Sequence, residues 1–226
     1  MNEGVLYVVA TPIGNLEDIT LRAVRILREA DRVLAEDTRY TGRLLKHLGI
    51  QARMTSLHGH NEKARTERVL EWLEEGHKLA LVSDAGTPAI SDPGSVIVAA
   101  ARDAGHRVVP VPGPCAFVAA ASAAGLPTDR LHFVGFLPGR PGRRRKVFEQ
   151  VLPAGGTVAV YVSPHRVLKD IAIAIEVAGA DRPACLCREL TKVYEEFDRG
   201  TLGELHERWS NKTPKGEMVL LVGPEP

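Results

Sequence analysis

The apolar run LYVVA, residues 6–10, leads directly into the turn TPIGN, residues 11–15, and a helical pattern of apolar residues begins soon afterwards. A second run, LALV at 79–82, leads into SDAGTP at 83–88. A buried strand, a tight turn rich in Gly and Pro and then a helix is how open α/β sheets build ligand crevices at the carboxyl ends of their strands. The two turns therefore predict two walls of one small-molecule site.

The length and composition are those of an ordinary globular protein. The 226 residues suffice for one large domain or two of usual size, and 44% are hydrophobic and 25% charged. The formal net charge is only +1, so contact with a nucleic acid has to come from a local patch. Aromatic residues make up 5% of the chain, which argues against large base-stacking platforms.

Cysteine usage and the N-terminus indicate the compartment. Cys115, Cys185 and Cys187 are odd in number and lack a C-x-x-C spacing, so neither a disulfide framework nor a zinc site is predicted. Cys185 and Cys187 alternate along one strand and are expected to be small buried hydrophobes. Residues 6–10 are too short for a signal peptide, and no segment approaches a membrane span. We expect a soluble, cytoplasmic protein with no membrane contact.

Strand and helix patterns alternate through the first half of the chain, which favours a mainly parallel sheet. In the second half several strands follow one another with little helix between them, which favours a mixed sheet. The boundary is placed at PGP, residues 112–114. The prediction is two α/β domains, 1–113 and 114–226, with a cofactor cleft between them.

The helix after the first strand illustrates the local reasoning. Asp18 or Thr20 can cap its N-terminus. Leu21, Val24 and Leu27 recur at helical spacing, so these three residues are expected to face the sheet.

The two glycine-containing turns differ in what they can bind. The first turn is not a G-x-G-x-x-G fingerprint, so a dinucleotide site is disfavoured. In the second turn Asp84 could hold an amino group or hydroxyl, and Gly86 would let a ligand lie against the main chain. The alternative for both turns is a purely structural strand-to-helix connection.

The segment EDTR, residues 36–39, follows a short strand, so its side chains should point into the crevice. Glu36, Asp37 and Arg39 could orient a hydroxyl and a phosphate. The alternative is an Asp or Thr helix cap with a solvated arginine.

The segment HGHNE, residues 58–62, contains two histidines and a glutamate. A third well-placed ligand is absent, so no metal site is predicted. Asn61 is more simply interpreted as the cap of the next helix.

A basic cluster occupies a predicted Gly/Pro/Arg loop at 138–146. Such a cluster suits contact with a phosphate backbone, and its contribution should fall with salt. The alternative is an ordinary solvated face. Its members are Arg140, Arg143, Arg144, Arg145 and Lys146.

Eight stretches together resemble the family of small-subunit rRNA (cytidine-2′-O)-methyltransferases, within the tetrapyrrole-methylase superfamily. They run from residue 6 to residue 223 and are LYVVATPIGNLEDITLRA, AEDTRYTGRLL, HGHNE, LVSDAGTPAISDPG, VPVPGPCAF, GLPTDRLHFVGFLP, RELTKVYEE and GEMVLLVG. The combination is specific, although most single pieces are not. Thr87 stands where tetrapyrrole-acting relatives usually carry an aspartate.

The resemblance implies S-adenosylmethionine as methyl donor, a homodimer, and transfer to the ribose 2′-hydroxyl of a cytidine in the decoding region of 16S rRNA, free or within the 30S subunit. Many members continue beyond the last strand into a helical domain; without it, recognition would rest on the two domains. The positions implied to contact the donor are Pro12, Asp84, Gly86, Thr87, Ile90, Cys115, Ala116, Tyr161, Val162, Leu190, Glu217 and Met218.

The implied chemistry needs an acceptor for the hydroxyl proton. We expect Asp37, with Glu36 beside it, to be that acceptor and Arg39 to fix an adjacent phosphate; His60 and Glu62 are secondary candidates. Other interpretations are a methylase of the same fold that acts on a tetrapyrrole or a protein side chain, a non-catalytic metabolite-binding protein, and a nicotinamide-dependent oxidoreductase. The EDTR segment and the arginines argue against the first, and the missing glycine fingerprint against the last.

Overall fold

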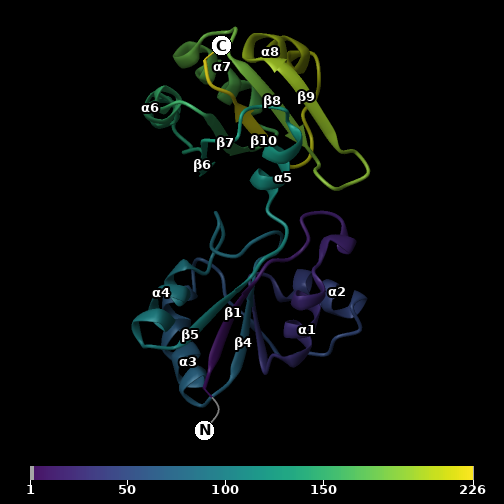
Figure 1. Cartoon of the computed structure of the whole chain (residues 1–226), viewed down its shortest axis with the longest axis vertical. Coiled ribbons are helices and arrows are strands. Elements are labelled where there is room, and N and C mark those ends of the chain that lie inside the picture. Colours follow the sequence, from purple (N-terminus) through teal and green to yellow (C-terminus); the bar gives the residue numbers. More distant parts are fainter. Residues whose placement is uncertain (1–2, 226) are drawn as a thin grey trace. The chain divides into compact units, whose positions relative to one another are not determined.

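The computed structural model describes residues 3–225 (Figure 1). The chain divides into two compact units, the first ending at Cys115 and the second beginning at Ala116. Each unit contains one five-stranded sheet. The predicted fold class, two α/β sheets of which the first is parallel and the second mixed, is confirmed. Among the described residues, no helix is long and apolar enough to cross a membrane.

The elements of the first unit alternate as predicted. They are β1 Val5–Val9, η1 Leu16–Asp18, α1 Leu21–Glu29, β2 Arg32–Ala35, α2 Thr38–His47, β3 Met54–Ser56, α3 Glu62–Glu74, β4 Lys78–Val82, α4 Ser95–Asp103 and β5 Arg107–Val111.

The first sheet has the strand order β3-β2-β4-β1-β5, and all its pairings are parallel. The connection that leaves β1 runs toward β2, whereas the connection that leaves β4 runs the other way, toward β5. The direction therefore reverses between the neighbours β4 and β1. Such a switch point is where open α/β sheets bind ligands, at the carboxyl ends of the strands.

Helices cover both faces of this sheet. One core cluster combines strand residues with Trp72 of α3 and Ile97 of α4, and the other with Ile26 of α1 and Leu45 of α2. In Figure 1, α3 and α4 accordingly lie on one side of the sheet and α1 and α2 on the other. This arrangement leaves the carboxyl ends of the strands uncovered by helices.

The inner face of α1 differs from the prediction. Thr20 is the cap, since its Oγ1 accepts a hydrogen bond from the N–H of Ala23 at 3.1 Å. The buried residues are Ala23, Ile26 and Leu27, whereas Leu21 is 91% exposed. At about 100° of rotation per residue, Leu21 lies roughly 120° around the helix from Leu27. Leu21 and Leu27 therefore cannot both face the sheet, and Leu27 is the one that does.

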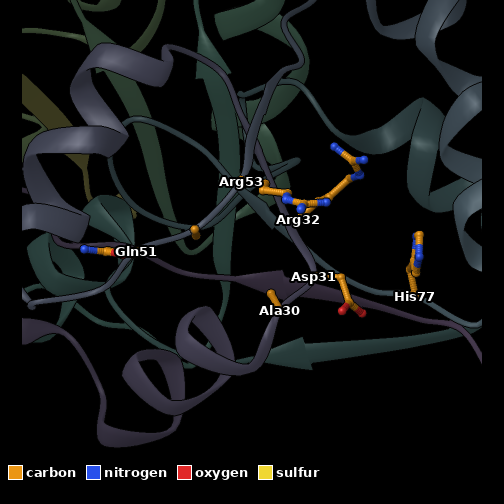
Figure 2. A pocket seen from close by; sticks show the side chains of 7 residues that line it. Ala30, Asp31, Arg32, Gln51, Arg53 and His77 are labelled. Atoms are coloured by element: carbon orange, nitrogen blue, oxygen red, sulfur yellow. The ribbon is translucent and has the colours of Figure 1, made fainter.

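A polar pocket lies at the end of the first sheet where its strands begin (Figure 2). It lies where β2, β3 and β4 begin, far from the turns that follow the strands. Asp31 braces this edge, because its Oδ2 accepts a hydrogen bond from the N–H of Lys78 at 2.7 Å. The lining residues are Ala30, Asp31, Arg32, Gln51, Ala52, Arg53 and His77.

The second unit follows a different order. Its elements are α5 Ala116–Ala123, β6 Leu131–Phe136, α6 Pro141–Val151, η2 Leu152–Ala154, β7 Thr157–Val162, α7 Val167–Ala178, β8 Pro183–Arg188, β9 Glu196–Thr201, α8 Leu202–Ser210 and β10 Met218–Val222.

The second sheet has the order β6-β7-β10-β8-β9, and only the pairing of β6 with β7 is parallel. One face packs against α6, α7 and α8 through a single core cluster that includes Phe148, Ile171 and Trp209. The short helix α5 contacts β7 and β10. Cys185 and Cys187 are fully buried with their Sγ atoms 3.8 Å apart, as expected for small core residues.

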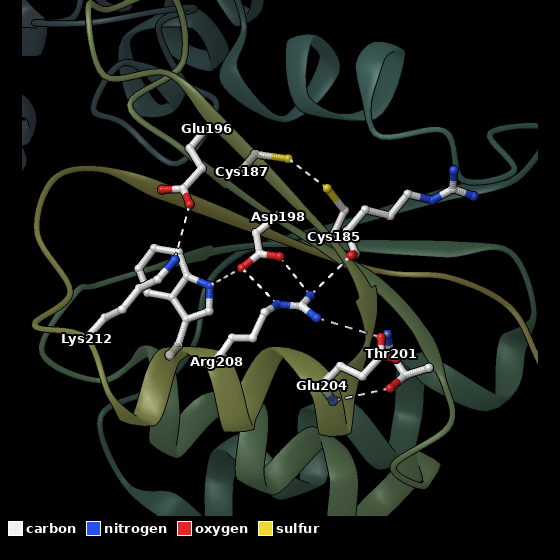
Figure 3. A network of polar contacts seen from close by, with 10 residues as sticks. Cys185, Cys187, Glu196, Asp198, Thr201, Glu204, Arg208 and Lys212 are labelled. Atoms are coloured by element: carbon white, nitrogen blue, oxygen red, sulfur yellow. Dashed lines mark hydrogen bonds and ion pairs between the residues drawn. The ribbon is translucent and has the colours of Figure 1, made fainter.

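A polar network attaches α8 to β9 (Figure 3). Thr201 and Glu204 form a capping box at the start of α8. Asp198 accepts hydrogen bonds from Nε1 of Trp209 and from the guanidinium of Arg208, both at 2.7 Å. These bonds satisfy the indole N–H of a buried tryptophan and fix the helix against the sheet edge.

Candidate active site

The turns that follow β1 and β4 are hydrogen-bonded to each other. The N–H of Thr11 donates to the carbonyl of Gly86 at 2.9 Å, and the N–H of Gly86 donates back at 3.0 Å. Thr11 is 2% exposed, and its Oγ1 also donates to the carbonyl of Ser83 at 3.1 Å. The two turns singled out in the sequence therefore lie side by side at the switch point.

The turn after β5 joins this pair. Oγ1 of Thr87 donates to the carbonyl of Pro114 at 3.0 Å. Gly86 has φ +87°, and a Cβ there would lie 3.3 Å from Cγ2 of Ile13. Only glycine adopts this conformation readily, and Gly86 is buried against Ile13 in this turn. The turns that follow the neighbouring strands β4, β1 and β5 are thus joined to one another by hydrogen bonds.

Glu62 fixes the end of the loop between β4 and α4 by hydrogen bonds to the start of α4. Its side chain is buried, and Oε1 accepts hydrogen bonds from the N–H groups of Gly94, Val96 and Ile97 at 3.0, 3.0 and 3.1 Å. These groups belong to the N-terminus of α4, where a carboxylate is favoured. The expectation that Glu62 accepts a proton is wrong, because its carboxylate is committed to this helix.

The loop that Glu62 holds is strained. Ala89 and Ser91 have φ of 67° and 63°, although neither is glycine. Such residues cost of order 1–3 kcal/mol each and persist where the surroundings impose them. The strain therefore indicates that the shape of this segment matters more than its local stability.

Three carboxylates line the carboxyl edge of the first sheet. Burial raises the pKa of Glu36, and the neighbouring charges of Asp84 and Asp92 raise it further. The pKa of Asp84 and the pKa of Asp92 are also raised, in each case chiefly by burial. Oδ1 of Asp84 accepts a hydrogen bond from the N–H of Asp37 at 3.0 Å, which ties β2 to β4. This edge is therefore electronegative and favours a cationic ligand.

Asp37 has a different environment from its neighbour Glu36. Asp37 caps α2, accepting from the N–H of Arg39 at 2.8 Å and from the Arg39 guanidinium at 2.7 Å. These hydrogen bonds hold the pKa of Asp37 well below its usual range. The Arg39 side chain is 87% exposed. The helix-cap alternative is thus the one observed, and a carboxylate of such low basicity accepts protons poorly.

The HGHNE segment folds as a turn into α3. Asn61 occupies the cap position, yet its Oδ1 accepts from the N–H of His58 at 2.9 Å instead of capping the helix. His60 is exposed. Within the described residues, no group of three or more His, Cys, Asp or Glu side chains could hold a metal ion.

In the second sheet, several of the other predicted cofactor-binding residues lie together where β7 ends and β10 begins. Val162 at the end of β7 pairs in register with Met218 at the start of β10. The adjacent Glu217 accepts a hydrogen bond from Nζ of Lys192 at 2.7 Å, and its backbone N–H donates to Glu189 at 2.8 Å.

The predicted cofactor-binding residues consequently form two sets. Pro12, Asp84, Gly86, Thr87, Ile90 and Cys115 belong to the first unit, and Ala116, Tyr161, Val162, Leu190, Glu217 and Met218 to the second. Sequence reasoning missed Thr11 and Asp92. The acid in the second half of SDAGTPAISDPG was the available signal for Asp92.

Most of the basic cluster lies on the helix α6 and not in the predicted loop, and Arg140 is the N-cap residue of that helix. Pro141 is at the first position of α6, where its fixed φ and missing N–H are tolerated. Arg144 is 3% exposed and pairs with Asp170 at 2.5 Å, so its expected contact with RNA is wrong. Arg145 pairs with Glu176, whereas Arg140, Arg143 and Lys146 are exposed. Neighbouring residues on a helix point in different directions, so Arg144 is buried although Arg143 beside it is exposed.

Comparison with known proteins agrees with this architecture. Residues 5–206 match the family Tetrapyrrole (Corrin/Porphyrin) Methylases. The structure is similar to a uroporphyrin-III-C-methyltransferase from Thermus thermophilus, with TM-score 0.70 and 24% identity, covering 97% of this chain and 94% of that one. A cobalt precorrin-4 methyltransferase gives TM-score 0.68 and 22% identity, with the same coverage. The chain belongs to the tetrapyrrole methylases.

More similar relatives define the particular branch. The chain is 48% identical to Ribosomal RNA small subunit methyltransferase I of Escherichia coli O157:H7, over 98% of this chain and 78% of the relative. The protein of that name from Halalkalibacterium halodurans is 49% identical over 98% and 76%, and that from Pseudomonas aeruginosa 48% over 98% and 79%. The chain is a methyltransferase of this family, which confirms the resemblance found in its motifs.

Proposed function

We propose that this protein transfers a methyl group from S-adenosylmethionine to the ribose 2′-hydroxyl of a cytidine in the decoding region of 16S rRNA. The observation that carries the proposal is the set of three joined turns beside an electronegative edge, in a chain whose relatives are named as rRNA methyltransferases. We further propose that it acts as a cytoplasmic homodimer, on free 16S rRNA or on the 30S subunit.

The residues of the first unit fit this cofactor. A sulfonium and an ammonium group are both cationic, and the carboxylates of Glu36, Asp84 and Asp92 provide opposite charge. When bound, the cofactor supplies an electrophilic methyl group. The residues proposed to hold it are Pro12, Asp84, Gly86, Thr87, Ile90 and Cys115, with Ala116, Tyr161, Val162, Leu190, Glu217 and Met218 from the second unit.

The remaining task of the protein is to position and activate the ribose hydroxyl. Alignment of a nucleophile against the carbon that it attacks removes much of the barrier. We assign the proton acceptor to Glu36 instead of Asp37, because the raised pKa of Glu36 makes its carboxylate the stronger base. We propose that the exposed guanidinium of Arg39, which Asp37 orients, contacts a phosphate.

Methyl-label transfer tests the proposal. The protein is incubated with labelled S-adenosylmethionine and, separately, with 30S subunits, free 16S rRNA, a uroporphyrinogen and a protein extract, followed by nucleoside analysis of the RNA. We expect label in 2′-O-methylcytidine only. Label in the tetrapyrrole or in protein would establish another methylase of the same fold. Binding of the donor without transfer to any acceptor would indicate a metabolite-binding protein.

A further inference from the structure

Four aromatic rings gather on one face of the second sheet. Phe117 of α5 stacks on Phe133 of β6 with centroids 4.1 Å apart. Phe133 and Phe136 each meet the ring of Tyr161 edge to face, at 5.0 and 5.3 Å. The composition argued against a base-stacking platform, yet these rings are concentrated in one place. Phe136 lies at the end of the row and is 59% exposed.

A β-bulge aims Phe136 at this face. Side chains three residues apart on a regular strand point to opposite faces. The pairing of β6 with β7 shifts register between Phe133 and Gly135, and Gly135 has φ +74°. The extra residue, Val134, brings Phe133 and Phe136 to the same side. Bulges of this kind re-aim a side chain next to functional sites.

Cationic side chains follow immediately along the chain. Arg140 lies four residues after Phe136, so their Cα atoms are at most about 14 Å apart. Arg140 and Arg143 are exposed, and the first turn of α6 contains no acidic side chain. The nearby cation Arg145 is paired with Glu176, and Arg144 is buried. An exposed ring is thus followed, four and seven residues along the chain, by two exposed guanidiniums that form no ion pair among the described residues. This combination is suited to a ligand with a π-face and adjoining negative charges.

We propose that Phe136 stacks an unpaired base of the RNA substrate while Arg140 and Arg143 contact the phosphates of neighbouring nucleotides. The inference rests on the proposed function and names the element that binds the RNA. Stacking on aromatic side chains combined with basic contacts to the backbone is how proteins bind single-stranded nucleic acid. Bases inside a duplex are already stacked on their neighbours, so the target nucleotide has to be unpaired or splayed out.

Fluorescence anisotropy with a labelled single-stranded oligoribonucleotide, and with the same sequence as a duplex, tests the proposal. Phe136→Leu keeps apolar bulk but removes the ring, and we expect it to weaken single-strand binding roughly 5- to 100-fold. Phe136→Trp should bind within a few-fold of the parent. Tyr194→Leu is the matched control, since Tyr194 is 72% exposed on the β8–β9 connection and should leave binding unchanged.

Two further measurements test whether the cofactor or a second copy of the chain, instead of RNA, occupies this surface. Calorimetry with S-adenosylmethionine and the sedimentation mass should be the same for Phe136→Leu and the parent. Unchanged single-strand binding by Phe136→Leu overturns the inference, as does a parent protein that binds no single-stranded RNA. Loss of donor affinity would assign the ring to the cofactor, and a changed mass would assign it to a second copy. Failure of methyl transfer by the parent would instead refute the proposed function.

Discussion

Oε1 of Glu62 accepts a hydrogen bond from the N–H of Gly94 at 3.0 Å, across a separation of 32 residues. The same oxygen also accepts hydrogen bonds from the N–H groups of Val96 and Ile97 in the first turn of α4, so one buried carboxylate fixes the end of the loop that follows β4. That loop carries Asp84, Gly86 and Thr87. Glu62 therefore positions the proposed cofactor-binding segment without being part of it.

Glu62→Gln keeps the size of the side chain but removes its charge. Hydrogen bonds to charged groups contribute about 1.5–3 kcal/mol each, so we expect a loss of stability near 2 kcal/mol and donor affinity about 10-fold lower. Thermal unfolding and calorimetry with S-adenosylmethionine measure the two effects. Thr201→Ala, which removes the capping box of α8, should lower stability by about 1 kcal/mol without affecting donor affinity. Equal donor affinities for both variants would show that Glu62 only stabilises the fold.

The carboxylates at the electronegative edge make stability depend on pH. Burial raises the pKa of Asp92 above its ordinary 3.8, so the folded state favours the protonated form. This group destabilises the folded protein increasingly as pH rises from about 4 through the raised pKa. Asp92→Asn should therefore increase the free energy of unfolding at neutral pH and flatten its decline in that window. Urea unfolding across the range measures both.

Asp37 gives the opposite sign and serves as the comparison. Its folded-state pKa is lowered, so its contribution is present above the ordinary pKa of 3.8 and is lost as pH falls. Asp37→Asn should lower stability at neutral pH and leave stability in strong acid unchanged. Identical pH profiles for Asp37→Asn and Asp92→Asn would contradict the contrast between the two environments.

Single-turnover kinetics with saturating donor distinguish the two candidate proton acceptors. Removal of a general base typically slows a reaction by about 10²–10⁴-fold, which we expect for Glu36→Gln. Asp37→Asn should slow transfer by less than about 10-fold, because it removes no proton acceptor and disturbs only the cap of α2 and the placement of Arg39. The parent rate should also rise with pH through the raised pKa of Glu36 and become flat in Glu36→Gln. A larger effect at Asp37 would return the role to that residue.

The parts of the fold set by short-range pattern could be predicted from the sequence. Apolar runs that end in Gly/Pro turns predicted the strands β1 and β4 and the closeness of the turns that follow them. The hydrogen bonds between Thr11 and Gly86 join these two turns. The same reasoning misplaced the inner face of α1, because Leu21 has the right character but the wrong angular position.

Three features of the site depend on long-range contacts and could not be read from the chain. Glu62 resembles any polar residue at a helix start until α4 is placed against it. Arg144 is one arginine in a run, and only its partner Asp170, 26 residues away, shows that it is buried. Phe136 lies on the same face of the sheet as Tyr161 because of a β-bulge, and the alternation of residues along the strand does not predict that bulge.

The adjacent residues Arg143 and Arg144 offer a direct test of how the helix α6 divides its charges. Arg144→Ala leaves Asp170 buried without a partner, and we expect a loss of about 3–5 kcal/mol of stability. The double change Arg144→Met with Asp170→Leu should recover most of that loss, because no charge is then buried. Arg143→Ala should change stability by less than about 0.5 kcal/mol. It should also reduce the slope of log K against log salt for single-stranded RNA by about 0.7. An unchanged salt slope for Arg143→Ala would make this surface an ordinary solvated helix face.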